Sequence, residues 1–169
     1  DIVNQLHSLE IFYIYFLGDE PLMRKDILDI LAHCAKKEIY TMISTNGWFV
    51  NTELAENLLE SGIRHFRVSL DVSTDEVHDS IRGVTGSFER AVTALENLKK
   101  AGIPTVGVSP TLMVDNFHQV GEIIDLSIKK GADEIQVVQL CKTGRGKHLS
   151  DLTTDQIKQA KAEVEKRVS

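Results

Sequence analysis

Short β-rich apolar segments alternate along the chain with longer segments whose apolar residues recur at helical spacing. Strands are expected at residues Ile11–Leu17, Tyr40–Thr45, His65–Leu70, Thr105–Thr111 and Glu134–Leu140. Between them, apolar residues three and four positions apart form single helix faces, as in Ile27, Ile30, Leu31 and Cys34. This alternation is typical of a parallel sheet with crossover helices, so the pattern predicts an α/β fold with about five β/α units.

Residues at the ends of the expected helices support this division. Three helices are followed by a glycine that suits a left-handed C-cap: Gly62, Gly102 and Gly131. N-caps are expected at Asn51 and Ser87, and Thr153 with Gln156 has the spacing of a capping box. The last helix is therefore expected from about Thr154, with three residues facing inward: Ile157, Ala160 and Val164.

The third expected strand shows which α/β architecture is favoured. Its apolar residues Phe66, Val68 and Leu70 alternate with Arg67, Ser69 and Asp71, so one face is apolar and the other polar. A doubly wound sheet, covered on both faces, prefers continuous apolar strands. The alternation favours a partial barrel with a polar interior, and 169 residues are few for a closed barrel of about 250. Arg67 is expected either to form a structural pair with an acid such as Asp71 or Glu20, which is favoured, or to face a ligand.

Composition and charge narrow the function classes. Hydrophobic residues make up 42% and charged residues 26%, and no apolar run approaches the length of a bilayer span. The first ten residues lack the pattern of a signal peptide, so a cytoplasmic protein is expected. The net charge of −6, without a basic stripe, argues against nucleic-acid binding. The two cysteines, Cys34 and Cys141, form neither a disulfide framework nor a zinc pattern.

Polar residues follow the expected strands at the ends where α/β folds bind ligands. The first strand leads into Gly18-Asp19-Glu20-Pro21, the second into Asn46-Gly47, and the third into Ser69 and Asp71, with Arg82 further on. Carboxylates, hydroxyls, an amide and an Arg on one rim suit a zwitterion that carries amino, carboxylate and sugar groups. His78 beside Asp79 is interpreted either as an oriented acid/base pair or as a polar loop contact that holds the helix after Asp71.

In these same positions the chain resembles the radical S-adenosylmethionine (radical SAM) enzymes. Gly18-Asp19-Glu20-Pro21 looks like the Gly-Gly-Glu-Pro motif of that superfamily. Its next stretches are matched in order by residues 43–47, 68–71, 78–79 and 82–83, and the similarity runs from about Ile11 to Ser150. Thr143 to Gly146, with Leu149 and Ser150, resemble members that mature peptides or build cofactors, the SPASM-like enzymes.

The resemblance implies a partial (β/α)6 barrel in which a [4Fe-4S] cluster binds S-adenosylmethionine and splits it reductively to a 5′-deoxyadenosyl radical. It places the methionyl amino group at Gly18, Asp19 and Glu20, with Asn46 on the same rim. Ser69 and Asp71 would meet the carboxylate or ribose, and Arg82 would pair with a carboxylate. The adenine would lie against backbone from about Val138 to Leu140. A small-molecule or peptide substrate and an electron donor are the implied partners.

Two departures from the family pattern qualify these expectations. Asp19 stands where the family has Gly. The family's Cys-x3-Cys-x2-Cys loop is expected before Asp1, so residues 1–169 are interpreted as one partial barrel domain that lacks its N-terminal portion and further sequence at the C-terminus. Cys34 and Cys141 do not replace that loop, because iron–sulfur clusters need several thiolates. The chain alone is therefore expected to be inactive.

Two other functions stay open. A non-catalytic module would keep the small-molecule pocket without the metal. A Schiff-base aldolase or lyase would need a lysine inside a strand, and the five expected strands contain none. Whichever function holds, the segment Ile11–Leu17 is expected to form an open sheet edge that favours self-association.

Overall fold

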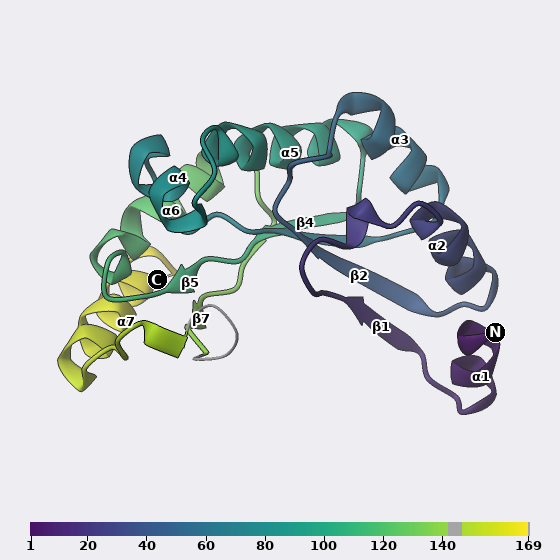
Figure 1. Ribbon diagram of the computed structural model, residues 1–169, viewed down its shortest axis with the longest axis horizontal. Coiled ribbons are helices and arrows are strands. Elements are labelled where there is room, and N and C mark those ends of the chain that lie inside the picture. The colour runs from purple at the N-terminus through teal and green to yellow at the C-terminus, as the bar shows by residue number, and fades with distance from the viewer. Residues whose placement is uncertain (142–146, 169) are drawn as a thin grey trace.

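The computed structural model describes residues 1–141 and 147–168, and its centre is a curved parallel sheet (Figure 1). Five strands pair in the order β1-β2-β3-β4-β6, and β5 pairs with β7 in a separate two-stranded sheet. The strands are β1 (Tyr13–Phe16), β2 (Tyr40–Thr45), β3 (His65–Val68), β4 (Thr105–Val108), β5 (Thr111–Leu112), β6 (Glu134–Ile135) and β7 (Val138–Gln139). All pairings are parallel, as the alternation of elements predicted.

Helices cover the convex side of this sheet. They are α1 (Ile2–Ser8), α2 (Ile27–Lys36), α3 (Thr52–Glu60), α4 (Asp75–Arg82), α5 (Ser87–Ala101), α6 (Val120–Lys129) and α7 (Thr154–Val168), with short 3-10 turns at η1 (Pro21–Met23) and η2 (Phe117–Gln119). Figure 1 shows α2 to α6 above the arch of strands, while α7 and α1 flank its two ends. Each strand or divided strand is followed by a helix, so the fold is the expected partial (β/α) barrel.

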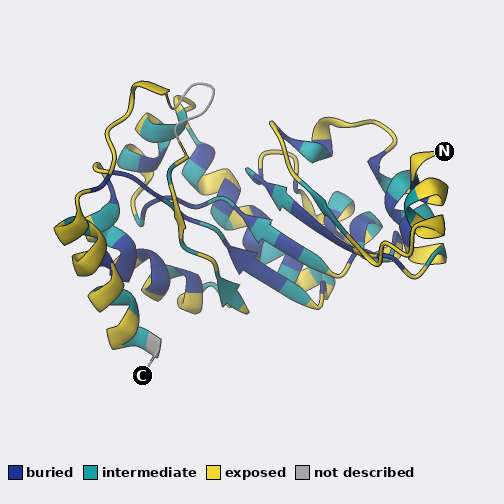
Figure 2. Cartoon of the chain, turned by 90° about the horizontal axis from the view of Figure 1, so that it is seen from below, coloured by how far each residue is buried: buried dark blue, intermediate teal, exposed yellow. Residues whose placement is uncertain are grey.

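The hydrophobic core lies between the sheet and the helices above it. Strand residues such as Ile43, Phe66 and Val106 are fully buried there against helical leucines such as Leu58 and Leu95. The neighbouring strand positions point to the concave face, which no helix of the described chain crosses when seen from below (Figure 2). Burial of this apolar face is the main favourable contribution to the packing of helices on the sheet. The alternation predicted for the third strand is confirmed, because Phe66 and Val68 are buried and Arg67 between them is not.

The two C-terminal strands differ from the expectation of one long strand each. Residues 105–111 divide into β4 and β5, and residues 134–140 divide into β6 and β7, so the prediction of continuous strands was wrong. The division occurs at Pro110. Its carbonyl accepts a hydrogen bond from Val138 N at 3.0 Å, but proline has no N–H that could donate to the neighbouring strand. The missing donor interrupts the ladder between the two short sheets.

Most predicted helix caps are present. The Asn51 side chain accepts from Leu54 N at 2.8 Å, and the Thr153–Gln156 capping box is reciprocal, with contacts of 2.8 and 3.3 Å. The three predicted C-terminal glycines all have positive φ: Gly62, Gly102 and Gly131. These local signals therefore set the helix boundaries.

Ser87 is not the N-cap of its helix, contrary to the prediction. It is the first residue of α5, and the side chain of Asp79 accepts from the backbone N–H groups of Gly86 and Phe88. The pKa of Asp79 is lowered because these backbone hydrogen bonds stabilise its charged form. A carboxylate from the preceding helix thus performs the capping that the sequence assigned to Ser87.

The two ends of the chain depart from the expected pattern in other ways. In α7, Ala160 is buried as expected, but Ile157 is 41% exposed, so its inward assignment was wrong. At the other end, Asp1 accepts from Val3 N and caps α1, a helix that the apolar pattern did not predict. Both helices lie at the flanks of the sheet, where packing is less complete.

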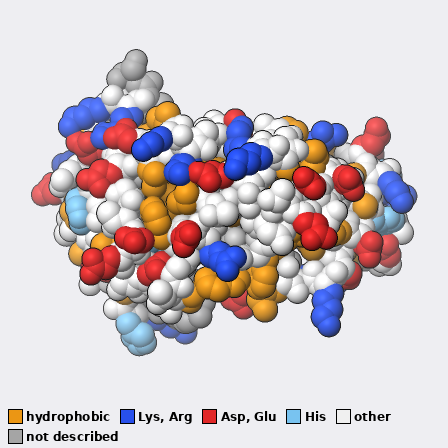
Figure 3. Space-filling model, turned by 90° about the horizontal axis from the view of Figure 1, so that it is seen from above, with side chains coloured by type: hydrophobic (Ala, Val, Ile, Leu, Met, Phe, Trp, Pro, Cys, Tyr) orange, Lys and Arg blue, Asp and Glu red, His pale blue; other side chains and the backbone are white. Residues whose placement is uncertain are grey.

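The outer surfaces agree with the remaining expectations. β1 is an edge strand, and Phe12 next to it is 79% exposed, so the open edge is present while self-association stays a prediction. Acidic and basic side chains are interspersed over the helical face, without a basic stripe (Figure 3). Within the described residues, none of the helices combines the length and apolarity that crossing a bilayer requires.

Candidate functional site

A cavity of about 430 Å³ opens at the carboxyl ends of β1, β2 and β3, and it is called the rim cavity below. Its volume lies in the range of small-molecule sites. Its lining residues include five that the sequence assigned to ligand contact, namely Gly18, Asp19, Asn46, Ser69 and Arg82. Since these residues come from three successive β/α units, the topology brings together what the sequence separates.

Glu20 lies behind the wall of the rim cavity and ties two of its loops together. It is 9% exposed, and its carboxylate accepts from Asn46 N at 2.8 Å, Thr45 Oγ1 at 2.9 Å and Leu22 N at 3.1 Å. Gly18 has a φ of +138°, a conformation that favours glycine, although a Cβ there would have no neighbour within 4 Å. The Gly-Asp-Glu-Pro segment is therefore fixed by Glu20, with its backbone open to the cavity at Gly18.

Asp71 is also a supporting residue and does not line the cavity. It is 2% exposed, its Oδ2 lies 2.6 Å from an Arg82 nitrogen, and its Oδ1 accepts from Thr111 N at 2.9 Å. The carboxylate that was expected to meet a ligand is thus occupied by protein groups. Its ion pair directs Arg82, whose side chain is 31% exposed, toward the cavity.

His78 is a buried residue of the cavity wall. It is 1% exposed, and its Nδ1 lies 3.0 Å from Ser87 Oγ, which joins α4 to α5. This contact agrees with the interpretation of His78 as the residue that holds the helix. Burial lowers the pKa of His78, so its neutral form is favoured.

The apolar wall of the cavity was not predicted. It is formed by four side chains: Met23, Trp48, Phe49 and Val84. The guanidinium of Arg90 lies 5.2 Å from the centre of the Trp48 ring, a cation–π contact that holds the ring at the rim. Trp48 and Phe49 directly follow the Asn46-Gly47 turn, so their position after a strand end was the available sequence signal.

Val138 and Leu140 lie apart from the rim cavity. They belong to β7 and the residue after it, and their backbone N–H groups donate to Pro110 O and Leu112 O at 3.0 and 3.1 Å. Their main-chain donors are therefore used within the sheet. The rim cavity does not include them, and the adenine contact expected at Val138 to Leu140 stays a prediction. The Thr143–Gly146 segment lies outside the described residues.

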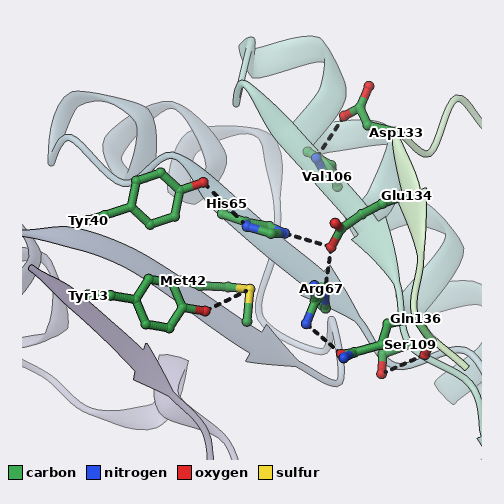
Figure 4. A network of polar contacts seen from close by, with 10 residues as sticks. All are labelled: Tyr13, Tyr40, Met42, His65, Arg67, Val106, Ser109, Asp133, Glu134 and Gln136. Carbon is green, nitrogen blue, oxygen red and sulfur yellow. Dashed lines mark hydrogen bonds and ion pairs between the residues drawn. The ribbon is translucent and has the colours of Figure 1, made fainter. Parts of the chain in front are cut away.

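A second polar region, whose residues do not line the rim cavity, covers the inner face of the sheet (Figure 4). Glu134 accepts from Arg67 Nε and lies 2.7 Å from His65 Nε2, while Arg67 also donates to Gln136. The expected structural pairing of Arg67 with an acid is confirmed, but the acid is Glu134 of β6 and not Asp71 or Glu20. Burial raises the pKa of Glu134, but the hydrogen bonds from Arg67 and His65 outweigh it and hold that pKa below its ordinary value.

Gly107 on β4 makes this inner-face network possible. Glu134 on β6 must reach across β4 to contact Arg67 on β3. A Cβ at position 107 would lie 2.5 Å from Glu134 Cγ and 3.0 Å from the Glu134 backbone oxygen. The side chain of Glu134 therefore occupies the space that a larger residue at 107 would fill.

The described residues do not supply a metal centre. They contain no group of three or more His, Cys, Asp or Glu placed to hold a metal ion. Cys34 is buried in α2, Cys141 is exposed after β7, and both are free. No lysine of the described chain lines the rim cavity, which leaves the Schiff-base alternative without its nucleophile there.

Comparison with known families gives one model match, to the radical SAM superfamily over residues 1–127. Among curated proteins, mycofactocin maturase MftC of Mycobacterium tuberculosis (strain CDC 1551 / Oshkosh) is 35% identical over 146 residues, which are 86% of this chain and 37% of the relative. Fe-coproporphyrin III synthase of Methanosarcina barkeri is 34% identical over 94% of this chain and 40% of the relative. The chain thus spans about two fifths of the length of these relatives.

Among solved structures, Streptococcus suis SuiB bound to S-adenosylmethionine superposes with a TM-score of 0.84 and 18% identity. The match covers 99% of this chain and 39% of SuiB, and a further SuiB structure contains its precursor peptide SuiA. The enzyme anSMEcpe with bound AdoMet and the Cp18Cys peptide matches 98% of this chain, with a TM-score of 0.77 and 17% identity. At these identities the structural matches establish the fold alone.

Proposed function

Since this chain belongs to the radical SAM superfamily, we propose that its rim cavity binds S-adenosylmethionine (SAM). The observation that carries the proposal is the convergence of Gly18, Asp19, Asn46, Ser69 and Arg82 on one cavity at the strand ends. The cavity combines carboxylate, hydroxyl and guanidinium groups with an apolar wall. This combination fits a ligand that has a zwitterionic end and an aromatic base.

The residues divide into those that contact the ligand and those that position them. Gly18 and Asp19 are assigned to the amino group, with Asn46 beside them. Ser69 and Arg82 are assigned to the carboxylate, because a guanidinium and a hydroxyl both donate hydrogen bonds to it. Glu20 and Asp71 act behind these residues through the hydrogen bonds and the ion pair described above.

The adenine is assigned to the apolar wall of Met23, Trp48, Phe49 and Val84. These side chains share the cavity with the polar residues, whereas Val138 and Leu140 do not. Aromatic rings and the Met23 thioether suit a flat base. This assignment is an alternative to the adenine contact at Val138 to Leu140 that the family resemblance implies.

The activity proposed for the longer protein is reductive cleavage of SAM at a [4Fe-4S] cluster, which starts radical chemistry on a substrate. When bound, the cluster supplies the electron for that cleavage. The described residues of this chain do not fit the cluster, since two distant cysteines cannot provide its thiolates. The contribution proposed for this chain is to bind and orient SAM.

A peptide is the substrate class that the comparisons favour, and an electron donor is the second proposed partner. SuiB is recorded with a precursor peptide, anSMEcpe with a peptide, and MftC is a maturase. The relative from Methanosarcina barkeri instead makes a porphyrin, so a small-molecule substrate is the alternative.

The proposal is tested by measuring SAM binding to the chain through the fluorescence of its single tryptophan, Trp48. Replacement of Arg82 by Ala removes a charge-assisted contact and is expected to weaken binding at least tenfold, or roughly 1.4 kcal/mol. Arg24→Ala is the matched control, because Arg24 is exposed and pairs only with Asp26 nearby. Absence of SAM binding to the unmutated chain, or equal loss in both variants, contradicts the proposal.

A second measurement concerns the cluster. After anaerobic incubation with iron and sulfide, the desalted chain is expected to stay colourless and to show no SAM cleavage. A brown preparation with stoichiometric iron would show that thiolates of this chain suffice after all.

A further inference from the structure

Two buried polar atoms on α4 lie at the rim cavity without a hydrogen-bond partner in the described chain. They are Nε2 of His78 and Nε of Arg82. The two residues are four positions apart on one helix, so their side chains lie on the same face, and both line the cavity. Buried polar groups in folded proteins are almost always paired. Helix α4 therefore presents unused hydrogen-bonding capacity to whatever fills the cavity.

The neighbours of His78 determine which of its ring nitrogens carries the proton. Ser87 Oγ lies 2.8 Å from Asp79 Oδ1 and 3.0 Å from His78 Nδ1. The Asp79 carboxylate can only accept, so the single proton of the Ser87 hydroxyl goes to it. Ser87 Oγ then accepts from Nδ1–H of His78. In a neutral imidazole this leaves Nε2 with a free lone pair, on a side chain that lines the cavity.

The other groups around the ring act on its pKa in both directions. Burial favours the neutral imidazole, although Asp71 raises the pKa of His78 and Arg82 lowers it. The backbone of Ser69 also lies close enough to raise that pKa, but Nε2 forms no hydrogen bond of normal geometry with it. The relay from Asp79 through Ser87 is the geometrically complete path, so it decides the tautomer.

We propose that His78 is a ligand-binding residue whose Nε2 accepts a hydrogen bond from SAM, an inference that rests on the proposed function. The donor is a ribose hydroxyl or the α-ammonium group, because a lone pair repels carboxylate oxygens. Arg82, one helical turn further on, receives those oxygens instead. Helix α4 thus offers the ligand one hydrogen-bond acceptor, His78, and one donor, Arg82. Each recognises a different group of the same ligand.

The first test uses the unmutated chain with ¹⁵N-labelled histidine and long-range ¹H–¹⁵N correlation spectra. Without ligand, His78 is expected to be protonated at Nδ1 and bare at Nε2. Saturating SAM is expected to shift the Nε2 resonance while Nδ1 stays nearly constant. The opposite tautomer, or an unmoved Nε2 signal when Trp48 fluorescence shows SAM to be bound, overturns the inference.

A second ligand separates the two sources of the hydrogen bond. 5′-Methylthioadenosine has the ribose hydroxyls of SAM but no α-ammonium group. If it shifts Nε2 as SAM does, the donor is a ribose hydroxyl. If only SAM shifts Nε2, the donor is the α-ammonium group.

Variants of His78 supply an independent measurement. His78→Leu is expected to weaken SAM binding about tenfold, since a buried donor of the ligand loses its acceptor. His78→Gln is expected to recover most of that affinity, because its amide oxygen accepts. His118→Leu, at an exposed histidine of η2, is the matched control and should bind SAM normally.

The outcomes distinguish this inference from the proposed function. If the unmutated chain does not bind SAM, both the proposed function and the inference about His78 are wrong. If His78→Leu and His118→Leu both bind SAM normally, only the proposed role of His78 is wrong. If circular dichroism shows the Leu variant to be unfolded, the spectra of the unmutated chain decide the question.

Discussion

The rim cavity and the inner face of the sheet are both lined by polar side chains, yet their pairing differs. On the inner face, Arg67, His65 and Glu134 satisfy one another across three strands (Figure 4). At the rim, Arg82 is held by Asp71, but Arg82 Nε and His78 Nε2 have no hydrogen-bond partner within the described residues. Among those residues, the inner-face network is therefore paired, whereas the rim keeps two buried polar atoms for a ligand of the kind proposed above.

This difference separates structural polar residues from ligand-binding ones. A buried polar group without a partner costs free energy, so a fold retains such a group where something else supplies the partner. Both regions contain an Arg, a His and a carboxylate, so residue types alone do not distinguish them. The distribution of hydrogen bonds does.

The largest effect is expected where the inner-face network depends on close packing. Gly107→Ala places a methyl group 2.5 Å from Glu134 Cγ and 3.0 Å from a backbone oxygen, so β4 and β6 must move apart. Overpacking of this kind is expected to lower the free energy of unfolding by about 3 kcal/mol, measured by urea denaturation. Gly121→Ala is the control, since its methyl group would lie 2.6 Å from the guanidinium end of Arg167, which can shift at the expense of its ion pairs with Asp125 and Glu163. Equal stability of the two variants would show that Glu134 has room to move.

A smaller effect is expected when a member of that network is removed without steric conflict. Arg67→Met keeps the side-chain length but leaves Glu134 with His65 as its partner, and the half-exposed carboxylate can recover some water. A loss of about 1 kcal/mol in the free energy of unfolding is expected. SAM affinity should stay unchanged, because Arg67 does not line the rim cavity. If Arg67→Met strongly weakens SAM binding while its stability stays normal, the inner-face network and the rim cavity belong to one binding site.

The smallest effect concerns the carboxylate that caps α5 beside the rim cavity. Backbone hydrogen bonds from Phe88 and Gly86 lower the pKa of Asp79 in the folded state. Its contribution to stability is therefore complete above the unfolded pKa of about 4 and is lost as the pH falls through the folded value. The urea midpoint of Asp79→Asn should lie below that of the unmutated chain at neutral pH. The gap should narrow in acid, and a gap independent of pH would exclude the charge as its cause.

Local patterns were sufficient to predict much of this molecule. The alternation of strands and helices, the two-residue period of residues 65–70 and the capping residues predicted a partial parallel barrel with a polar inner face. The order of the polar turns predicted which residues would meet at the rim, because parallel strands end at one edge of a sheet. These features follow from the backbone geometry of short segments, so a single sequence contains them.

Tertiary structure decided which of those residues face the cavity and which stand behind it. Glu20 and Asp71 are buried and accept hydrogen bonds from protein groups. Arg67 pairs with Glu134, which lies 67 positions away in the sequence. The pairing depends on strand order, on register and on the space left by Gly107, and none of these is visible in a local pattern. Hydrogen-bond partners that are distant in sequence are chosen by the packed sheet, because only packing fixes the few ångströms that a hydrogen bond requires.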